Sequence, residues 1–301
     1  MPPDSQTIPR IDVAALFAGP SPQRDRVDAA ILAAARDSGF MTIGNLPADL
    51  PMDAAHRRAL LRIFDLPSDE TRQLWRQKFA PAHRNIYRGW FPLQNGAETY
   101  KEGIDLGPDL AYGADRIDAQ DPLREATPLP PEAALPGWRE AAASYFRAME
   151  RIGAALMHAL ARGLNLPEGI FDEAFAGGIS TLRLIRYPVR PPESMAGIPE
   201  DRLWIEQDGR RHYMLGRAHV DSGLVTLLAQ DGVSGLQARA SDGTWLDVPP
   251  GEGALAVNFG KLLERWTGGR IKATEHRVIG SNRERCSVPF FYEPRTDAEI
   301  A

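Results

Sequence analysis

The first half of the chain carries apolar residues at the three- and four-residue spacing of amphipathic helices. Ser21 followed by Pro22 predicts the start of one helix, because serine caps exposed amides and proline suits the first helical position. Two further helical stretches are expected at about 52–66 and 67–78. A longer apolar stripe at about 138–162 predicts a helix that packs against a sheet as its support.

The segment 80–136, which precedes the long helix, is interrupted repeatedly by glycine and proline. Connections of this length in compact proteins are often functional or contain short structure of their own. We therefore expect this segment to wrap around the core and to contribute to a substrate cavity.

From residue 180 onward the pattern changes to short runs typical of β-strands, separated by glycine, proline and Asp-Gly turns. The runs are STLRLIRY, LWIEQ, RHYML, LVTLLAQ, GLQARA, TWLDV, ALAVNF, IKATEHRVI and RCSVPFFY. Asp208-Gly209 separates two of them and predicts a tight hairpin turn. Helices first and many short strands afterwards indicate an α+β protein with a jelly-roll core and helices laid on one side.

Composition narrows the classes of function. The chain has 301 residues, of which 43% are hydrophobic, so it can bury a core of enzyme size. Its formal net charge is -5 and its Lys and Arg residues are scattered, which argues against nucleic acid or a membrane surface as partners. No secretory signal and no membrane span are expected. Cys286 is the single cysteine, so we expect a reducing compartment and a cytoplasmic location.

His219 and Asp221 place an imidazole and a carboxylate two residues apart, on the same face of an extended strand. His276 offers a third ligand from a later strand, which a jelly roll could bring across the mouth of its barrel. Two imidazoles and one carboxylate suit iron(II) and leave about three coordination positions for substrates. A lone His-x-Asp pair is more often an ordinary surface or core feature, so this assignment depends on its context.

Arg285 lies nine residues beyond His276, and Ser287 follows it on the same strand face. An arginine fork holds a carboxylate through two hydrogen bonds while a nearby hydroxyl donates another. Beside a metal with open positions, this pair would anchor the remote carboxylate of a keto acid. Taken alone, the pair is more typical of an exposed strand, where arginine and serine are common.

Several motifs follow one another in a set order along the chain. In the second half they are LRLIRYP, AHVDSGLVTLLAQD, GLQA, NFGKLLERWTGGRIKATEHRV and RCSVPFFYEP. Near the N-terminus they are IPRIDVAAL and ARDSGFMTIGNLP. This order resembles the isopenicillin N synthase-type family of iron(II)/2-oxoglutarate-dependent dioxygenases, and the resemblance spans nearly the whole chain.

The resemblance implies a double-stranded β-helix, which is a jelly roll, with iron bound by His219, Asp221 and His276. It implies that the C5 carboxylate of 2-oxoglutarate binds Arg285 and Ser287. The protein would then be an enzyme that uses Fe(II), O2 and 2-oxoglutarate to oxidise a small organic substrate. Hydroxylation is the commonest outcome that the resemblance implies, and desaturation or ring closure with the same oxidant stays open.

Tyr187, in the RYP motif, matches a family tyrosine that points into the same cavity and contacts co-substrate or substrate. A packing role in the core is equally open for it. The resemblance also divides the chain into an N-terminal helical and wrapping region, 1–136, and a jelly-roll domain with its supporting helix, 137–301. The core of that domain is expected at about 178–294.

Two features depart from the family pattern. Lys261 stands where many plant relatives have an acidic residue, and the stretch between Tyr187 and His219 is longer than theirs. The extra residues are expected to form a hairpin that reshapes the entrance of the cavity. The substrate of a plant relative therefore does not transfer to this chain.

Candidate substrate contacts lie in the NIYRGWFP segment and on the last strand. They are Tyr87, Arg88, Trp90, Phe91 and Phe291. Arg88 is the residue expected to pair with a substrate carboxylate. For the aromatic residues, packing between the helices and the sheet is the favoured alternative.

Two other functions remain open from the sequence. A member of the same family that dispenses with 2-oxoglutarate would be an oxidase or oxidative cyclase, in which the Arg-Ser pair binds a substrate carboxylate. A noncatalytic sensor of a metal or metabolite could use the same scaffold, although the intact ligand set argues against it. The sequence carries no indication of the oligomeric state.

Overall fold

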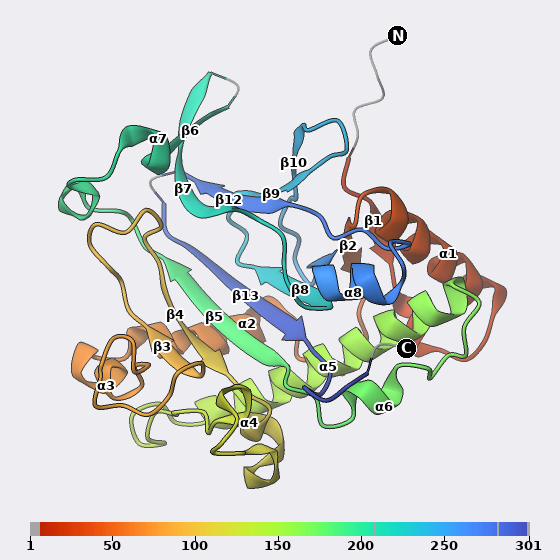
Figure 1. The fold of residues 1–301 in the computed structure, drawn as a ribbon, viewed down its shortest axis with the longest axis horizontal. Helices are drawn as coiled ribbons and strands as arrows, with labels where there is room; N and C mark the ends of the chain where they lie inside the picture. Colours follow the sequence, from red (N-terminus) through yellow and green to blue (C-terminus); the bar gives the residue numbers. More distant parts are fainter. Residues whose placement is uncertain (1–6, 208, 282, 300–301) are drawn as a thin grey trace.

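Two β-sheets form the centre of the structure, a computed structural model that describes residues 7–207, 209–281 and 283–299 (Figure 1). In spatial order, the larger sheet contains β1 (Arg10–Asp12), β2 (Phe40–Gly44), β11 (Leu255–Phe259), β8 (Val225–Gln230), β13 (Arg285–Tyr292), β5 (Thr181–Tyr187), β4 (Glu102–Leu106) and β3 (Gly89–Phe91). The smaller sheet contains β10 (Trp245–Asp247), β9 (Leu236–Arg239), β12 (His276–Gly280), β7 (Arg210–His219) and β6 (Trp204–Gln207).

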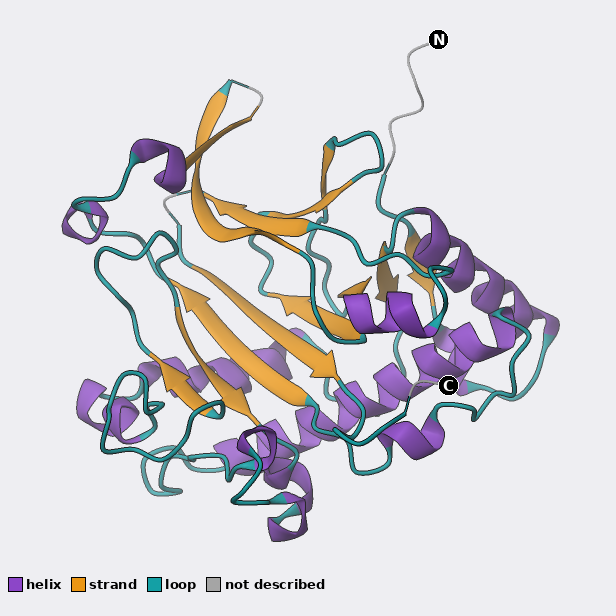
Figure 2. Ribbon diagram, in the orientation of Figure 1, coloured by secondary structure: helices purple, strands orange, loops and turns teal. Residues whose placement is uncertain are grey.

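Most of the helices cover the outer face of the larger sheet (Figure 2). The longest, α5 (Trp138–Gly163), buries one side, including Tyr145 and Phe146, in the main hydrophobic core. Both α1 (Pro22–Asp37) and α2 (Ala54–Leu61) pack against α5. The short α-helices of the described residues are α3 (Ser68–Gln73), α4 (Asp109–Tyr112), α6 (Asp172–Phe175), α7 (Glu200–Leu203) and α8 (Lys261–Trp266).

A second, smaller core lies between the two sheets. It joins Ile185 and Tyr187 of β5 to Leu215 of β7, Leu236 of β9 and Val278 of β12. Because alternate residues of a strand share a face, side chains an even number of positions from these also point between the sheets. This inner space is where chemistry-bearing side chains from distant parts of the chain meet.

The α+β class and the jelly-roll core predicted from the sequence are confirmed. The helix start at Ser21 and Pro22 is confirmed too, because α1 begins at Pro22 and Ser21 Oγ accepts a hydrogen bond from Arg24 N at 3.2 Å. The long supporting helix, predicted at about 138–162, spans 138–163. Among the described residues, no helix has the length and apolar character needed to span a membrane.

The helices predicted at 52–66 and 67–78 are shorter than expected. The first gives way at Arg62 to a 3-10 turn, and the second ends at Gln73. Beyond it the backbone pairs with the edge of the sheet instead, since Arg76 N donates to Trp90 O at 3.1 Å. Tertiary pairing therefore overrides the local helical pattern at this point.

The segment 80–136, which was expected to wrap around the core and to contribute to a cavity, contains two strands, β3 and β4. All five residues of β4 are buried, and it pairs with β5 along its full length. Residues on both sides of position 136 thus share one sheet and one main core. The domain division at 136/137 stays a prediction from the family resemblance.

Two further differences lie near β12 and β7. The predicted strand IKATEHRVI begins only at His276, because the residues before it are tied to the end of α1: Lys272 N donates to Ala35 O at 3.0 Å. Asp208, in the predicted hairpin turn, lies outside the described residues. The strands on either side of it, β6 and β7, do pair antiparallel, with Gln207 opposite Arg210.

Candidate metal centre and adjoining cavity

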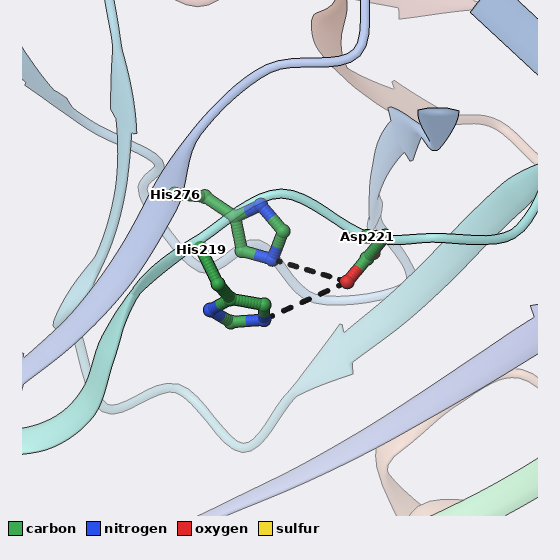
Figure 3. A group of neighbouring side chains, drawn as sticks. All are labelled: His219, Asp221 and His276. Atoms are coloured by element: carbon green, nitrogen blue, oxygen red, sulfur yellow. Dashed lines mark ion pairs between the residues drawn. The ribbon is translucent and has the colours of Figure 1, made fainter. Parts of the chain in front are cut away.

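Three side chains predicted to bind a metal come together at one end of the smaller sheet (Figure 3). His219 is the last residue of β7 and lies opposite His276, the first residue of β12. Asp221 lies two residues beyond the end of β7, in the segment that links it to β8, so strand alternation does not account for the convergence. The Nε2 atoms of the two histidines lie 3.6 Å and 3.7 Å from Asp221 Oδ1.

A hydrogen bond at Nδ1 of each histidine fixes the orientation of its ring, so that Nε2 faces the position where a metal would bind. The Nδ1 atoms of His219 and His276 lie 2.7 Å and 3.2 Å from the carbonyl oxygens of Arg217 and Thr274. Because a carbonyl only accepts, each Nδ1 carries the hydrogen, and each Nε2 keeps a lone pair for a metal.

The carboxylate of Asp221 is held in the same manner. Its Oδ2 accepts hydrogen bonds from Thr226 Oγ1 at 2.6 Å and from Asn258 Nδ2 at 2.8 Å. These two donors come from β8 and β11 of the larger sheet. Oδ1 is thereby left facing the histidines, so one atom from each of the three residues points to a common position.

The charge states of the triad suit a divalent cation. Burial lowers the pKa of His276, and the neighbouring His219 adds to this effect against the opposing charge of Asp221. Burial also opposes ionisation of Asp221, but His276 and the hydrogen bonds from Thr226 and Asn258 outweigh it and hold its pKa below the usual value. A neutral imidazole beside an ionised carboxylate is the state in which these groups bind metal.

Replacing Thr226 with valine is expected to weaken ferrous-iron binding by about 10- to 100-fold, since it removes a donor that orients Asp221. An anaerobic equilibrium titration measures this affinity. Thr42→Val is a matched control, because Thr42 is also buried in the larger sheet and its Oγ1 donates to Pro9 O at 3.3 Å, away from the triad. Equal affinity losses in both variants would contradict the role given to Thr226.

The predicted co-substrate residues lie together on the inner face of the larger sheet. Arg285 of β13 is opposite Tyr187 of β5, and its guanidinium carbon is 5.4 Å from the centroid of that ring. Ser287 is opposite Gln230, whose Oε1 accepts a hydrogen bond from Arg285 Nη2 at 3.2 Å. Arg285, Ser287 and Tyr187 are all buried.

Arg285 is buried, and some of its N–H donors are unpaired in the described part of the chain. Its Nε and Nη1 atoms are inaccessible to solvent and find no acceptor among the described residues. A buried donor without a partner costs free energy, of the order of 1–3 kcal/mol and more for a charged group. The unpaired donors of this guanidinium could receive an anion, and a carboxylate suits the geometry of an arginine fork.

A cavity of about 560 Å³ opens beside the triad. Its lining residues are Tyr87, Leu123, Ile179, Arg183, His219, Val220, Asp221, Ser222, Gly223, Leu262, Phe291 and Glu293. The cavity lies within the size range of small-molecule sites. Burial raises the pKa of the Glu293 carboxyl in this wall to about 7.

Two of the five predicted substrate contacts, Tyr87 and Phe291, line this cavity. Phe91 is not among the lining residues, but its ring packs against the guanidinium of Arg183, which lines the cavity. Arg88 and Trp90 lie elsewhere. Trp90 is part of the main core.

The guanidinium of Arg88 is fully buried. Its Nη2 donates to the carbonyl oxygens of Leu123 and Ile179, both at 3.0 Å, and Nη1 donates to Thr181 Oγ1. Two of these acceptors are backbone carbonyl groups, and the third is the hydroxyl group of a residue on β5. The substrate role predicted for Arg88 and Trp90 therefore has no support from the geometry.

Sequence reasoning missed Arg183 and Glu293 as cavity residues. Arg183 is four positions before Tyr187 on β5, so strand alternation placed it on the same inner face. That signal was present in the LRLIRY motif. Glu293 lies just beyond the end of β13, where no periodicity gives a direction.

The two departures from the family pattern also have visible consequences. The side chain of Lys261 forms an ion pair with Glu264 of its own helix, α8. Lys261 Nζ lies 2.7 Å from Glu264 Oε2. The longer stretch between Tyr187 and His219 contains α7 and the β6–β7 hairpin, which stands out at one end of the smaller sheet (Figure 1). The expected extra hairpin is thus present.

Known proteins resemble the chain over most of its length. Residues 183–294 match the model of the 2OG-Fe(II) oxygenase superfamily. The isopenicillin N synthase of Streptomyces clavuligerus is 29% identical over 303 residues, which cover 98% of this chain and 87% of that protein. The 2-oxoglutarate-Fe(II) type oxidoreductase hxnY of Emericella nidulans is 35% identical over 206 residues, 67% of this chain and 54% of that protein.

Among solved structures, full-length Neurospora crassa T7H in complex with alpha-KG and 5-formyluracil is 25% identical to the chain. It aligns with a TM-score of 0.79 over 100% of this chain and 88% of that one. The same fungal protein has also been solved with alpha-KG and thymine, at 24% identity and a TM-score of 0.80. The jelly roll and its helical cover are thus common to both proteins.

Proposed function

Because the chain belongs to the 2OG-Fe(II) oxygenase superfamily and is an Fe(II)- and 2-oxoglutarate-dependent dioxygenase, we propose that it hydroxylates a small organic substrate at the His219, Asp221 and His276 centre. In this proposal Arg285 and Ser287 bind the far carboxylate of 2-oxoglutarate, beside Tyr187. A cytoplasmic location is part of the proposal, since a single cysteine allows no intramolecular disulfide.

One observation carries the proposal: the triad at the end of the smaller sheet and the unpaired donors of Arg285 on the larger sheet both belong to the space between the two sheets. Arg285, Ser287 and Phe291 are an even number of positions apart on β13, so they point to the same side of the sheet. Phe291 lines the cavity beside the triad, and Arg285 carries buried donors without acceptors in the described part of the chain. A dicarboxylic keto acid placed along this face would satisfy both sites.

The chain's own residues prepare this chemistry by positioning. Carbonyl groups of Arg217 and Thr274 hold the two imidazoles, while Thr226 and Asn258 leave one oxygen of Asp221 free. Iron bound there would supply the activation of O2 and the oxidation of a substrate C–H bond. Tyr87 and Phe291 in the cavity wall offer apolar surface on which the carbon skeleton of a substrate would pack beside the triad.

The test is turnover with and without each component. Purified protein with added ferrous iron is expected to consume O2 and to form succinate from 2-oxoglutarate, to stop on chelation, and to recover when iron is restored. Undiminished O2 consumption without 2-oxoglutarate would instead identify an oxidase. Tight 2-oxoglutarate binding without succinate formation, across a broad panel of substrates, would identify a sensor.

A further inference from the structure

Arg183 faces the cavity beside the triad with an immobilised guanidinium. Its guanidinium carbon lies 5.6 Å from the centroid of the Phe91 ring and 5.2 Å from that of the Phe291 ring. Aromatic rings attract a cation placed over their faces. The arginine is therefore held between aromatic residues and does not extend freely into solvent.

Asp105 fixes one edge of the same group. Arg183 donates from Nε to Asp105 Oδ1 and from Nη2 to Oδ2, the latter at 2.8 Å. Asp105 lies on β4 and is fully buried. A two-point contact of this kind sets the direction of the whole guanidinium plane.

The opposite edge of the guanidinium remains available. Nη1 of Arg183 makes no hydrogen bond within the described residues, and 27% of the side chain is exposed. Together with the second hydrogen of Nη2, it forms another fork of two parallel donors. Because Arg183 lines the cavity that contains His219 and Asp221, this fork is open to a molecule bound there.

The local charge also favours an anion. Asp105 is shared between Arg183 and Arg76, so one carboxylate serves two cations. Arg88, close by, has Asp105, Asp109 and Glu125 as acidic neighbours, so a third cation also acts on Asp105. Glu293 is the acidic residue of the cavity wall outside the triad, and its Oε1 already accepts a hydrogen bond from Leu224 N at 3.3 Å.

We infer that the prime substrate is a small organic acid whose carboxylate binds the free fork of Arg183, while its carbon skeleton lies against Tyr87 and Phe291. This inference rests on the proposed function, because it concerns the same cavity. Arginine is suited to the task, since it pairs with a planar carboxylate through two charge-assisted hydrogen bonds. Arg183 is then the residue that selects acids over neutral analogues.

Matched acids and primary amides test this selection. Benzoate, phenylacetate, 3-phenylpropanoate and hexanoate are each compared with the corresponding amide, which keeps the shape and removes the charge. Binding is measured by anaerobic calorimetry on protein loaded with Fe(II) and 2-oxoglutarate, and stimulated succinate formation is measured in air. At least one acid is expected to bind about tenfold or more tightly than its amide.

The Arg183→Gln variant is expected to lose this preference to within about twofold, because the fork and its charge are gone. Arg183→Lys keeps the charge and should retain part of it. Arg186→Gln is the matched control, since Arg186 lies on the same strand but pairs with Glu102, Nε to Oε1 at 2.9 Å. That variant should keep the full preference.

Three results would overturn the inference: amides that bind as tightly as acids, a preference that survives in Arg183→Gln, or no binding by any acid to the wild type. Stabilisation of each variant by 2-oxoglutarate, measured in the same preparations, reports folding and the co-substrate site separately. If the wild type itself neither binds nor converts 2-oxoglutarate, the proposed function fails first. The two failures are thus distinguishable.

Discussion

Replacing Asp221 with alanine is expected to abolish iron binding and succinate formation. The change removes the Oδ1 ligand and the negative charge that the two neutral imidazoles require beside a divalent ion. The loss should exceed the about 10- to 100-fold that follows removal of a supporting hydrogen bond. Iron per protein after desalting, together with succinate formation, measures the effect.

Two further variants serve as controls for the Asp221→Ala result. Asp221→Asn keeps the size of the side chain and an oxygen for Thr226 or Asn258, so it guards against simple misfolding. His212→Ala is the control on β7, because His212 lies on the same strand but outside the triad. Full iron content and full succinate formation in Asp221→Ala would contradict the assignment of this ligand.

Arg285→Gln is expected to raise the 2-oxoglutarate concentration needed for half-maximal rate by about 10- to 150-fold. A hydrogen bond to a charged group contributes about 1.5–3 kcal/mol, and each 1.4 kcal/mol corresponds to a factor of about ten. Steady-state kinetics with 2-oxoglutarate as the varied component measure this change. The kcat at saturation should fall less, because the triad is intact.

A second readout separates co-substrate binding from folding. Arg285 is a buried cation with unpaired donors, so its removal should leave the stability of the ligand-free protein unchanged or increase it. The thermal stabilisation that 2-oxoglutarate gives the wild type should be lost. Arg186→Gln should retain it, and an unchanged 2-oxoglutarate requirement in Arg285→Gln would place the anchor elsewhere.

The metal ligands could be predicted from the sequence because the family resemblance supported the otherwise weak His219-x-Asp221 pair and implied His276 as the third ligand. His219, Asp221 and His276 converge as predicted, although Asp221 lies beyond the end of the strand that contains His219. Arg285 and Ser287 lie two positions apart on one strand, and that is enough to place them on one face. For Arg285 and Ser287 local geometry decides the outcome, whereas the metal triad also needs the pairing of β7 with β12.

The substrate cavity was less predictable because its walls depend on pairing between distant segments. Arg88 was expected at the cavity, yet its guanidinium is buried against carbonyl groups that β5 and the segment near Leu123 bring to it. Arg183 was not predicted as a cavity residue. Its guanidinium is oriented by Asp105, which lies 78 positions earlier in the chain. The local pattern of polar and apolar residues placed Arg183 on the inner face of β5, but it has no signature of the Asp105 pairing or of the contacts that bury Arg88.

A crystal structure of the protein grown anaerobically with ferrous iron and 2-oxoglutarate is the most direct test, with iron located by its anomalous scattering. One iron peak is expected between His219 Nε2, Asp221 Oδ1 and His276 Nε2, with the far carboxylate of 2-oxoglutarate on Arg285. An iron peak away from these three atoms, or a keto acid that leaves Arg285 unpaired, would contradict the account.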